Sequence, residues 1–182
     1  MANRITKQQI YILIAFMSLL IGVVMWQYIT PGRKTEQAAT QLVEIAERIR
    51  RKYAAKIDYW GLNTQVVINN KILQEFSTDG ENLINALGKP FNIGQGENAE
   101  TVMPGEKSFD IIYTGLSMGE CIALASFPMK HPEEVGLLKI TIINAKENKT
   151  FNWGANDYKL PISRDAARKV CKKDSKIIWT IE

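Results

Sequence analysis

Residues 10–29 read IYILIAFMSLLIGVVMWQYI, a run of twenty residues without a charged side chain. At about 1.5 Å rise per residue, a helix of this length spans roughly 30 Å, the thickness of the hydrocarbon core of a bilayer. A cleaved secretory signal has a shorter apolar core and ends at a small-x-small site, which is missing here. Trp26 and Tyr28 suit the membrane interface. The run therefore predicts one uncleaved transmembrane helix at residues 10–29, preceded by a cytoplasmic segment at residues 1–9.

An amphipathic helical pattern follows the apolar run. Apolar residues recur at spacings of three or four and would form one packing face: Ala38, Leu42, Ile45, Ile49 and Tyr53. Pro31 and Gly32 interrupt the pattern, because proline lacks an amide donor and glycine is a poor helix former. We therefore expect a stalk helix over residues 30–57 that continues the membrane span, with a kink at Pro31 and Gly32.

The two cysteines, Cys121 and Cys171, favour a disulfide. They lack the close spacing of zinc ligands, and His131 is the single histidine of the chain. A disulfide needs an oxidising compartment, which in a bacterium is the periplasm or the cell surface. Lys and Arg lie on both sides of the apolar run in similar numbers, so the cysteines rather than the charges indicate the orientation.

Residues 58–182 predict one small α+β head domain. Three runs have the length and the β-branched and aromatic content of strands: residues 109–114, 137–143 and 176–181. Three short helices are expected: residues 64–70 after the Thr64 hydroxyl, 121–126 after an S-x-x-E capping box at Ser117, and 164–173 after Ser163. Residues 77–107 are rich in Gly, Asn, Asp and Glu and predict a loop region with one or two short strands.

Enzymatic and nucleotide-binding patterns are missing from the sequence. His131 lies in a predicted loop without a nucleophile motif near it and is interpreted as a solvated side chain. Gly94-Gln95-Gly96 lacks the third glycine of a dinucleotide fingerprint and is interpreted as a flexible turn. The excess of positive charge lies near the apolar run, which argues against a nucleic-acid-binding head. We therefore expect a non-enzymatic protein without catalytic, cofactor or metal sites, and with no nucleic-acid or small-molecule partner.

Four segments in a fixed order carry a resemblance to a known family. They are GLNT and VVIN within residues 61–69, LGKPF at 87–91, IIYTGL at 111–116 ahead of Cys121, and LPIS at 160–163 followed by Ala166, Ala167, Cys171 and IWTI at 178–181. In these segments the chain resembles the type IVb pilins and is most similar to those of the PilS kind.

The resemblance implies a fold and a function. The fold is an α+β pilin fold, with a long N-terminal helix packed on an antiparallel sheet and a C-terminal disulfide between Cys121 and Cys171. The function is that of a major or minor structural subunit of a surface or conjugative type IV pilus. Its location is the bacterial inner membrane, with the head in the periplasm, or the pilus at the cell surface. Its partners are membrane lipid and, through the N-terminal helix, further copies or other pilin-like subunits.

The first residues depart from the pilin pattern. Pilins carry a Gly before the cleavage point and a Glu five residues into the mature helix, whereas residues 1–9 contain no Gly and no acidic residue precedes Glu36. This departure leaves an alternative open. The chain could be a single-pass periplasmic adaptor of a secretion or conjugation machine that has a pilin-like fold and does not polymerise.

Overall fold

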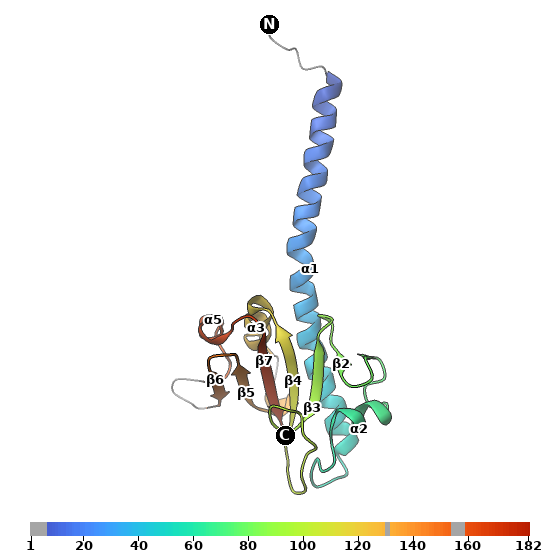
Figure 1. Ribbon diagram of the computed structural model, residues 1–182, viewed down its shortest axis with the longest axis vertical. Helices are drawn as coiled ribbons and strands as arrows, with labels where there is room; N and C mark the ends of the chain where they lie inside the picture. Colours follow the sequence, from blue (N-terminus) through green and yellow to red (C-terminus); the bar gives the residue numbers. More distant parts are fainter. Residues whose placement is uncertain (1–6, 130–131, 154–158) are drawn as a thin grey trace. The chain divides into compact units, whose positions relative to one another are not determined.

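A computed structural model describes residues 7–129, 132–153 and 159–182. The chain divides into two compact units, Met1–Lys34 and Thr35–Glu182, which we call the N-terminal and the C-terminal unit. Helix α1 (Lys7–Tyr53) begins in the N-terminal unit and ends in the C-terminal unit, and all later elements belong to the C-terminal unit (Figure 1).

The predicted membrane span at residues 10–29 falls within α1. Apart from Met17 and Ser18, its side chains lie outside the described residues. In the part of the chain that the structure describes, no helix is both long and apolar enough to cross a membrane. Helix α1 is continuous through Pro31 and Gly32, and the kink expected there stays a prediction.

Helix α1 ends at Tyr53, earlier than residue 57, where the stalk helix was expected to end. The Lys56 amide donates a hydrogen bond to the Tyr53 carbonyl oxygen at 2.8 Å, which closes a tight turn. The turn brings the ring of Tyr59 to 5.4 Å from that of Tyr53 and to 4.7 Å from that of Phe109, measured between centroids. The helix ends early because this turn packs three aromatic rings together.

Within the described residues, seven strands form one sheet in the order β1-β2-β3-β4-β7-β5-β6, and all neighbouring pairs are antiparallel (Figure 1). In chain order the strands are β1 (Ser77–Thr78), β2 (Leu83–Ile84), β3 (Pro90–Gly94), β4 (Phe109–Leu116), β5 (Leu137–Ile143), β6 (Asn148–Asn152) and β7 (Ser175–Ile181). The three strands expected from the sequence are confirmed as β4, β5 and β7. The last strand of the chain, β7, lies between β4 and β5 and joins the two halves of the sheet.

Strands β1, β2 and β3 lie in residues 77–107, where the sequence indicated mainly loop. Strand β3 pairs with β4 through Phe91 opposite Tyr113 and Ile93 opposite Ile111. Both β3 residues are fully buried. The strand is therefore held by packing and pairing with a distant segment rather than by its own propensity, since it contains proline, asparagine and glycine.

The described residues also form short helices: α2 (Thr64–Asn69), which precedes the first strand, and α3 (Met118–Ala125), α4 (Pro132–Val135) and α5 (Arg164–Val170), which lie between strands. The capping box of α3 at Ser117 and the Ser163 cap of α5 are confirmed. The expectation that the Thr64 hydroxyl starts α2 is wrong, because the Asn63 side chain accepts the bond from the Val66 amide at 2.8 Å.

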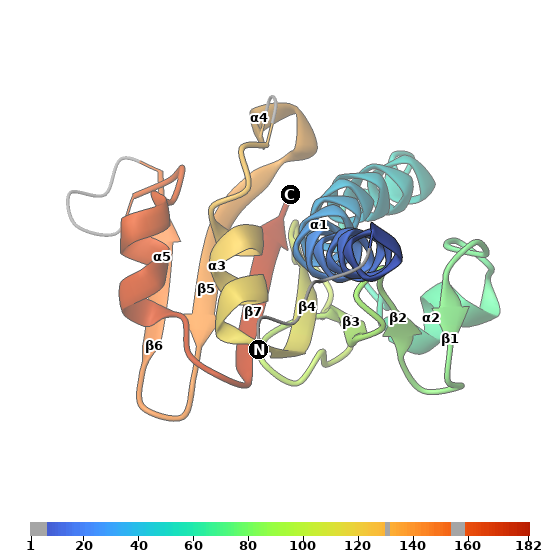
Figure 2. The same ribbon diagram turned by 90° about the horizontal axis from the view of Figure 1, so that it is seen from above.

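The core of the C-terminal unit lies between α1 and the sheet. Residues 35–53 of α1 lie against the part of the sheet that holds β3 and β4, and α3 and α5 lie side by side further along it (Figure 2). A row of rings crosses three strands beneath α1: Phe91, Tyr113 and Trp179, with centroid distances of 5.4 and 5.0 Å between successive rings. The Tyr113 hydroxyl donates a hydrogen bond to the Ala38 carbonyl oxygen at 3.2 Å and so ties the sheet to the helix.

Candidate functional site

The disulfide lies between two helices beside the centre of the sheet. Cys121 belongs to α3, and Cys171 is the C-terminal cap of α5, just ahead of β7. The two residues form the predicted disulfide with their Cα atoms 5.7 Å apart, and both are fully buried. The bridge closes residues 121–171, which include β5 and β6, into a covalent loop around the sheet edge.

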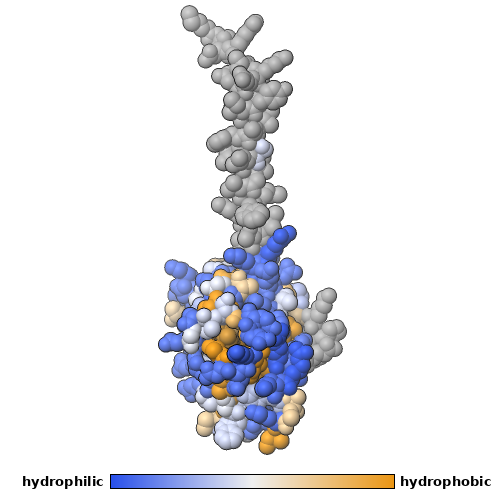
Figure 3. Space-filling view, turned by 90° about the vertical axis from the view of Figure 1, so that its right-hand side faces the viewer, coloured by the Kyte–Doolittle hydropathy of each residue, from blue (hydrophilic) through white to orange (hydrophobic). Residues whose placement is uncertain are grey.

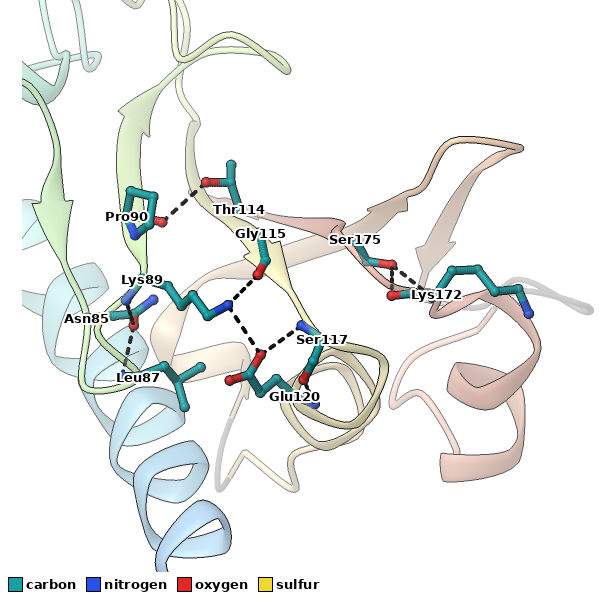
Figure 4. A network of polar contacts seen from close by, with 10 residues as sticks. All are labelled: Asn85, Leu87, Lys89, Pro90, Thr114, Gly115, Ser117, Glu120, Lys172 and Ser175. Carbon is teal, nitrogen blue, oxygen red and sulfur yellow. Dashed lines mark hydrogen bonds and ion pairs between the residues drawn. The ribbon is translucent and has the colours of Figure 1, made fainter.

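Polar contacts fix the start of α3, directly before Cys121. The Ser117 side chain accepts a hydrogen bond from the Glu120 amide, and the Glu120 carboxylate accepts one from the Ser117 amide at 2.7 Å. The Lys89 ammonium reaches this cap from the β2–β3 turn, where it donates to the Gly115 carbonyl oxygen at 2.6 Å and lies 3.9 Å from the Glu120 carboxylate (Figure 4). The turn and the helix are thereby held together across the end of β4.

A second polar turn follows Cys171 and leads into β7. The Ser175 hydroxyl accepts a hydrogen bond from the Lys172 amide at 2.9 Å and donates one to the Lys172 carbonyl oxygen at 2.8 Å (Figure 4). Asp174 adopts a positive φ of 60° within this turn. Helix α5 therefore ends at Val170, before its expected end at residue 173, because the chain must reverse to enter the sheet.

The predicted packing face of the stalk faces the sheet of the same chain. All five residues of this face are buried in the core of the C-terminal unit: Ala38, Leu42, Ile45, Ile49 and Tyr53. Desolvation by burial raises the pKa of Tyr113, whose ring packs beneath the helix. This face of α1 is therefore covered by the sheet of its own chain.

An open groove of about 800 Å³ lies beside the end of α1. Tyr53 and Tyr59 contribute aromatic surface to it, and burial raises the pKa of both hydroxyls. The Lys56 ammonium sits over the Tyr53 ring, 4.3 Å from its centroid. The remaining lining carries both signs of charge, with Arg51 and Lys107 on one hand and Glu47 and Asp58 on the other. This mixture suits a protein contact rather than a small anion.

The described residues contain no group of three or more His, Cys, Asp or Glu side chains placed to hold a metal ion. Both cysteines are consumed by the disulfide, which removes the thiol as a nucleophile or ligand. His131, interpreted from the sequence as a solvated side chain, lies outside the described residues.

One structural feature of the sheet was missed from the sequence. The loop after β3 crosses the face of the sheet opposite α1, where the Gly96 amide donates to the Asp110 carboxylate at 2.7 Å and the Lys176 ammonium donates to the Glu97 carbonyl oxygen at 2.9 Å. The Thr180 hydroxyl also donates to Asp110, at 2.5 Å. Asp110 is the one sequence feature that could have indicated this loop, since it is an acidic residue inside a largely apolar strand. A buried carboxylate needs hydrogen-bond donors around it, and the loop supplies one of them.

Comparison with known proteins identifies relatives of this arrangement. The family model described as Bundlin matches residues 27–181. Two solved structures share the fold. One is a type IVb pilin from Salmonella typhi, with 12% identity over 79% of this chain and 97% of that chain and a TM-score of 0.51. The other is TcpA, a type IV pilin from the Vibrio cholerae El Tor biotype, with 14% identity over 82% of this chain and 99% of that chain and a TM-score of 0.52. The search among curated protein sequences gave no match.

Proposed function

The chain belongs to the Bundlin family and is a pilin structural subunit, and we propose that it serves as a major or minor subunit of a surface or conjugative type IV pilus. The observation that carries the proposal is the family match over residues 27–181, in which an antiparallel sheet, a helix packed on it and a C-terminal disulfide occur together. Pilins form a structural family, and we propose that this subunit has no catalytic activity.

A membrane-bound precursor is part of the same proposal. Residues 10–29 carry no charge over a length that matches a bilayer, which supports a single-pass anchor in the inner membrane. The disulfide supports a periplasmic C-terminal unit, because it requires an oxidising compartment. During assembly the same apolar helix can leave lipid for contact with copies of itself or with other pilin-like subunits, since both surroundings are apolar.

The buried face of α1 limits how such subunits can pack. Ala38, Leu42, Ile45 and Ile49 are already covered by the sheet of their own chain. We propose that the intersubunit helix contacts are made by the apolar residues 10–29 and by the faces of α1 turned away from the sheet. A variant at residues 10–29 should therefore impair assembly without unfolding the C-terminal unit.

Mechanical shearing of cells tests the proposal. A pilus subunit appears in the sheared fraction and co-purifies with fibres seen by electron microscopy. If the chain stays wholly with the membranes, and its mass shows an unprocessed N-terminus, the observations support the alternative of a non-polymerising periplasmic adaptor of a secretion or conjugation machine. The specific observation behind that alternative is the missing Gly and Glu near the start of the sequence.

A further inference from the structure

The direction of β4 distinguishes the two ends of the C-terminal unit. The Tyr113 hydroxyl bonds to the Ala38 carbonyl oxygen, close to Thr35, where α1 enters the unit. Phe109, which comes earlier in β4, instead packs against Tyr59, beyond the other end of α1. Strand β4 therefore runs toward Thr35, and we call the end of the unit at which β4 finishes the entry end.

The connections next to α5 gather at the entry end. Strand β7 begins there, because Ser175 pairs with the last residue of β4. Strand β5 ends there, since its last residue pairs with Lys176. The turn after β5 contacts the end of α5, where the Asn144 side-chain amide donates to the Val170 carbonyl oxygen at 2.7 Å. Figure 1 shows α3 and α5 at this end of the unit.

The entry end carries an excess of positive charge. Three of its acidic side chains each lie close to a basic one, at 3.9, 3.8 and 3.7 Å: Glu120 beside Lys89, Glu147 beside Lys149 and Asp165 beside Arg168. Five further basic side chains are exposed, and within the described residues none of them pairs with a carboxylate; we call them the basic cluster: Lys146, Arg164, Lys169, Lys172 and Lys173. Of the exposed acidic residues near this end that have no basic partner in the described chain, Asp174 lies beside the cluster, whereas Glu36 lies on α1 and Glu97 on the opposite face of the sheet.

The other end of the unit has a different surface. Its exposed charged side chains are of both signs in similar numbers: Arg51, Lys52, Lys56 and Lys107 with Glu47, Glu106 and Glu182. It also exposes the large apolar side chains of Ile57, Trp60 and Met103. Hydrophobic surface is visible at the lower end of the unit in Figure 3. An anionic surface therefore suits the entry end and not the end opposite to it.

The length of the chain limits how far the entry end can lie from a bilayer. Residues 30–34 alone separate the apolar run at residues 10–29 from Thr35. Even a fully extended chain of this length spans only about 20 Å, so an anchor at residues 10–29 keeps Thr35 close to the headgroups. Electrostatic attraction fades over roughly 8–10 Å at physiological ionic strength, so the charge of the membrane-proximal end is the charge that the lipid senses.

We propose that the basic cluster docks the C-terminal unit onto the anionic phospholipid headgroups of the membrane that holds residues 10–29. The inference rests on the proposed function, because it requires the single-pass anchor. The anchor holds the entry end beside the lipid at a high effective concentration, whereas a soluble polyanion has no such tether. Each basic residue near an anionic membrane surface strengthens binding by roughly fivefold. Docking would fix the orientation of the subunit on the membrane before it enters a fibre.

The test reconstitutes the full chain in liposomes of phosphatidylcholine alone or of phosphatidylcholine mixed with phosphatidylglycerol. Met118 is 46% exposed at the start of α3, at the entry end, and a photoreactive benzophenone amino acid can replace it. On illumination it should crosslink to lipid with a several-fold higher yield in the mixed liposomes, as measured by mass spectrometry. The same amino acid in place of Trp60, at the other end of the unit, should show no such increase. Salt at about 1 M should remove the increase, because it shortens the screening length to about 3 Å.

Charge-neutral variants test whether the basic cluster causes the increase. The cluster variant combines Lys146→Gln, Lys169→Gln and Lys173→Gln, whose side chains form no hydrogen bond or ion pair within the described part of the chain. It should reduce the yield in mixed liposomes to that in phosphatidylcholine alone. The matched control removes the same charge from the other end of the unit and should keep the increase: Arg51→Gln, Lys52→Gln and Lys107→Gln. An intact disulfide and an unchanged urea midpoint serve as folding controls.

Several results would overturn this inference alone. They are equal yields in the two kinds of liposome, an increase that persists in the cluster variant, an equal loss in both triple variants, or crosslinks from position 118 to another copy of the chain in place of lipid. Failure of the wild-type chain to float with the liposomes would overturn the membrane anchor of the proposed function, and this inference with it.

Discussion

Gly94 ends β3 where the chain turns back over the sheet, and its substitution by alanine tests how tightly that loop is packed. A Cβ added at this position would lie 2.5 Å from the carbonyl carbon and oxygen of Ala99 and 2.5 Å from the carbonyl oxygen of Glu100. These are backbone atoms, and reciprocal hydrogen bonds between Gln95 and Glu100, at 2.8 and 3.0 Å, hold them in place. They cannot swing away as the end of a flexible side chain could.

The expected cost follows from the overlap. Carbon atoms in contact settle at about 3.5–4.0 Å, so the loop would have to move by roughly an ångström to admit the methyl group. Such overpacking typically costs about 1–3 kcal/mol. Movement of the loop would also weaken the bond from the Gly96 amide to the Asp110 carboxylate, which is 2.7 Å long. We expect Gly94→Ala to lower the free energy of unfolding by about 2 kcal/mol.

Gly119 provides a matched control, since a Cβ there meets no atom within 4 Å and the residue lies inside α3. Gly119→Ala should stabilise the protein by up to about 1 kcal/mol, because alanine is the better helix former. The assay is urea unfolding of the full chain in detergent, followed by tryptophan fluorescence. With a slope of about 2 kcal/mol per M, Gly94→Ala should lower the midpoint by roughly 1 M. A midpoint equal to that of the wild type, or an equal loss in Gly119→Ala, would refute the reasoning.

Three further perturbations probe the covalent loop, the buried ring row and the stalk face. The Cys121–Cys171 bond joins residues separated by 50 positions, so its reduction should lower the free energy of unfolding by about 4 kcal/mol. The measurement compares urea midpoints with and without reductant, and equal midpoints would contradict this prediction. Burial raises the pKa of Tyr113 in the folded protein above its unfolded value of about 10. The neutral Tyr113 side chain therefore makes its full contribution to the free energy of unfolding below about pH 10, and that contribution decreases as the pH rises above this value. Tyr113→Phe should therefore flatten the alkaline decline of stability, and an unchanged slope would count against this account. Ile49→Ala removes a fully buried side chain and should lower the free energy of unfolding by about 2–5 kcal/mol in the urea assay. Glu47→Ala, at an exposed position of the same helix, should change it by less than about 0.5 kcal/mol. Equal changes in the two variants would show that the burial argument is wrong.

Local signals predicted much of the fold. Strands β4, β5 and β7 carry β-branched and aromatic residues that favour extended backbone wherever they are placed. The caps at Ser117 and Ser163 are short-range hydrogen-bond patterns, so a few residues of sequence are enough to recognise them. The resemblance to type IVb pilins also predicted the family correctly, and the Cys121–Cys171 disulfide agrees with both the residues and the resemblance.

Features that depend on distant partners were not predictable in the same way. Strand β3 contains Asn92 between Phe91 and Ile93, and it becomes a strand because β4 supplies both its hydrogen bonds and its buried neighbours. The cap of α2 was assigned to Thr64, but that hydroxyl bonds to the backbone of Ile93, accepting from its amide at 2.9 Å and donating to its carbonyl oxygen at 3.1 Å.

The central place of β7 explains why the disulfide lies where it does. Strand β7 pairs with β4 on one side and with β5 on the other, so among the described residues no strand of β1 to β4 pairs directly with β5 or β6. Detachment of β7 from β4 and β5 would therefore divide the sheet and expose Trp179 and the neighbouring Tyr113 ring to solvent. Cys171 precedes β7 by a single polar turn and is bonded to Cys121, which follows β4 by a single capped turn. The bridge therefore ties the end of β4 to the start of β7, the two strands whose antiparallel pairing joins the halves of the sheet. It acts most directly against separation of these two strands, which is the opening that would divide the sheet.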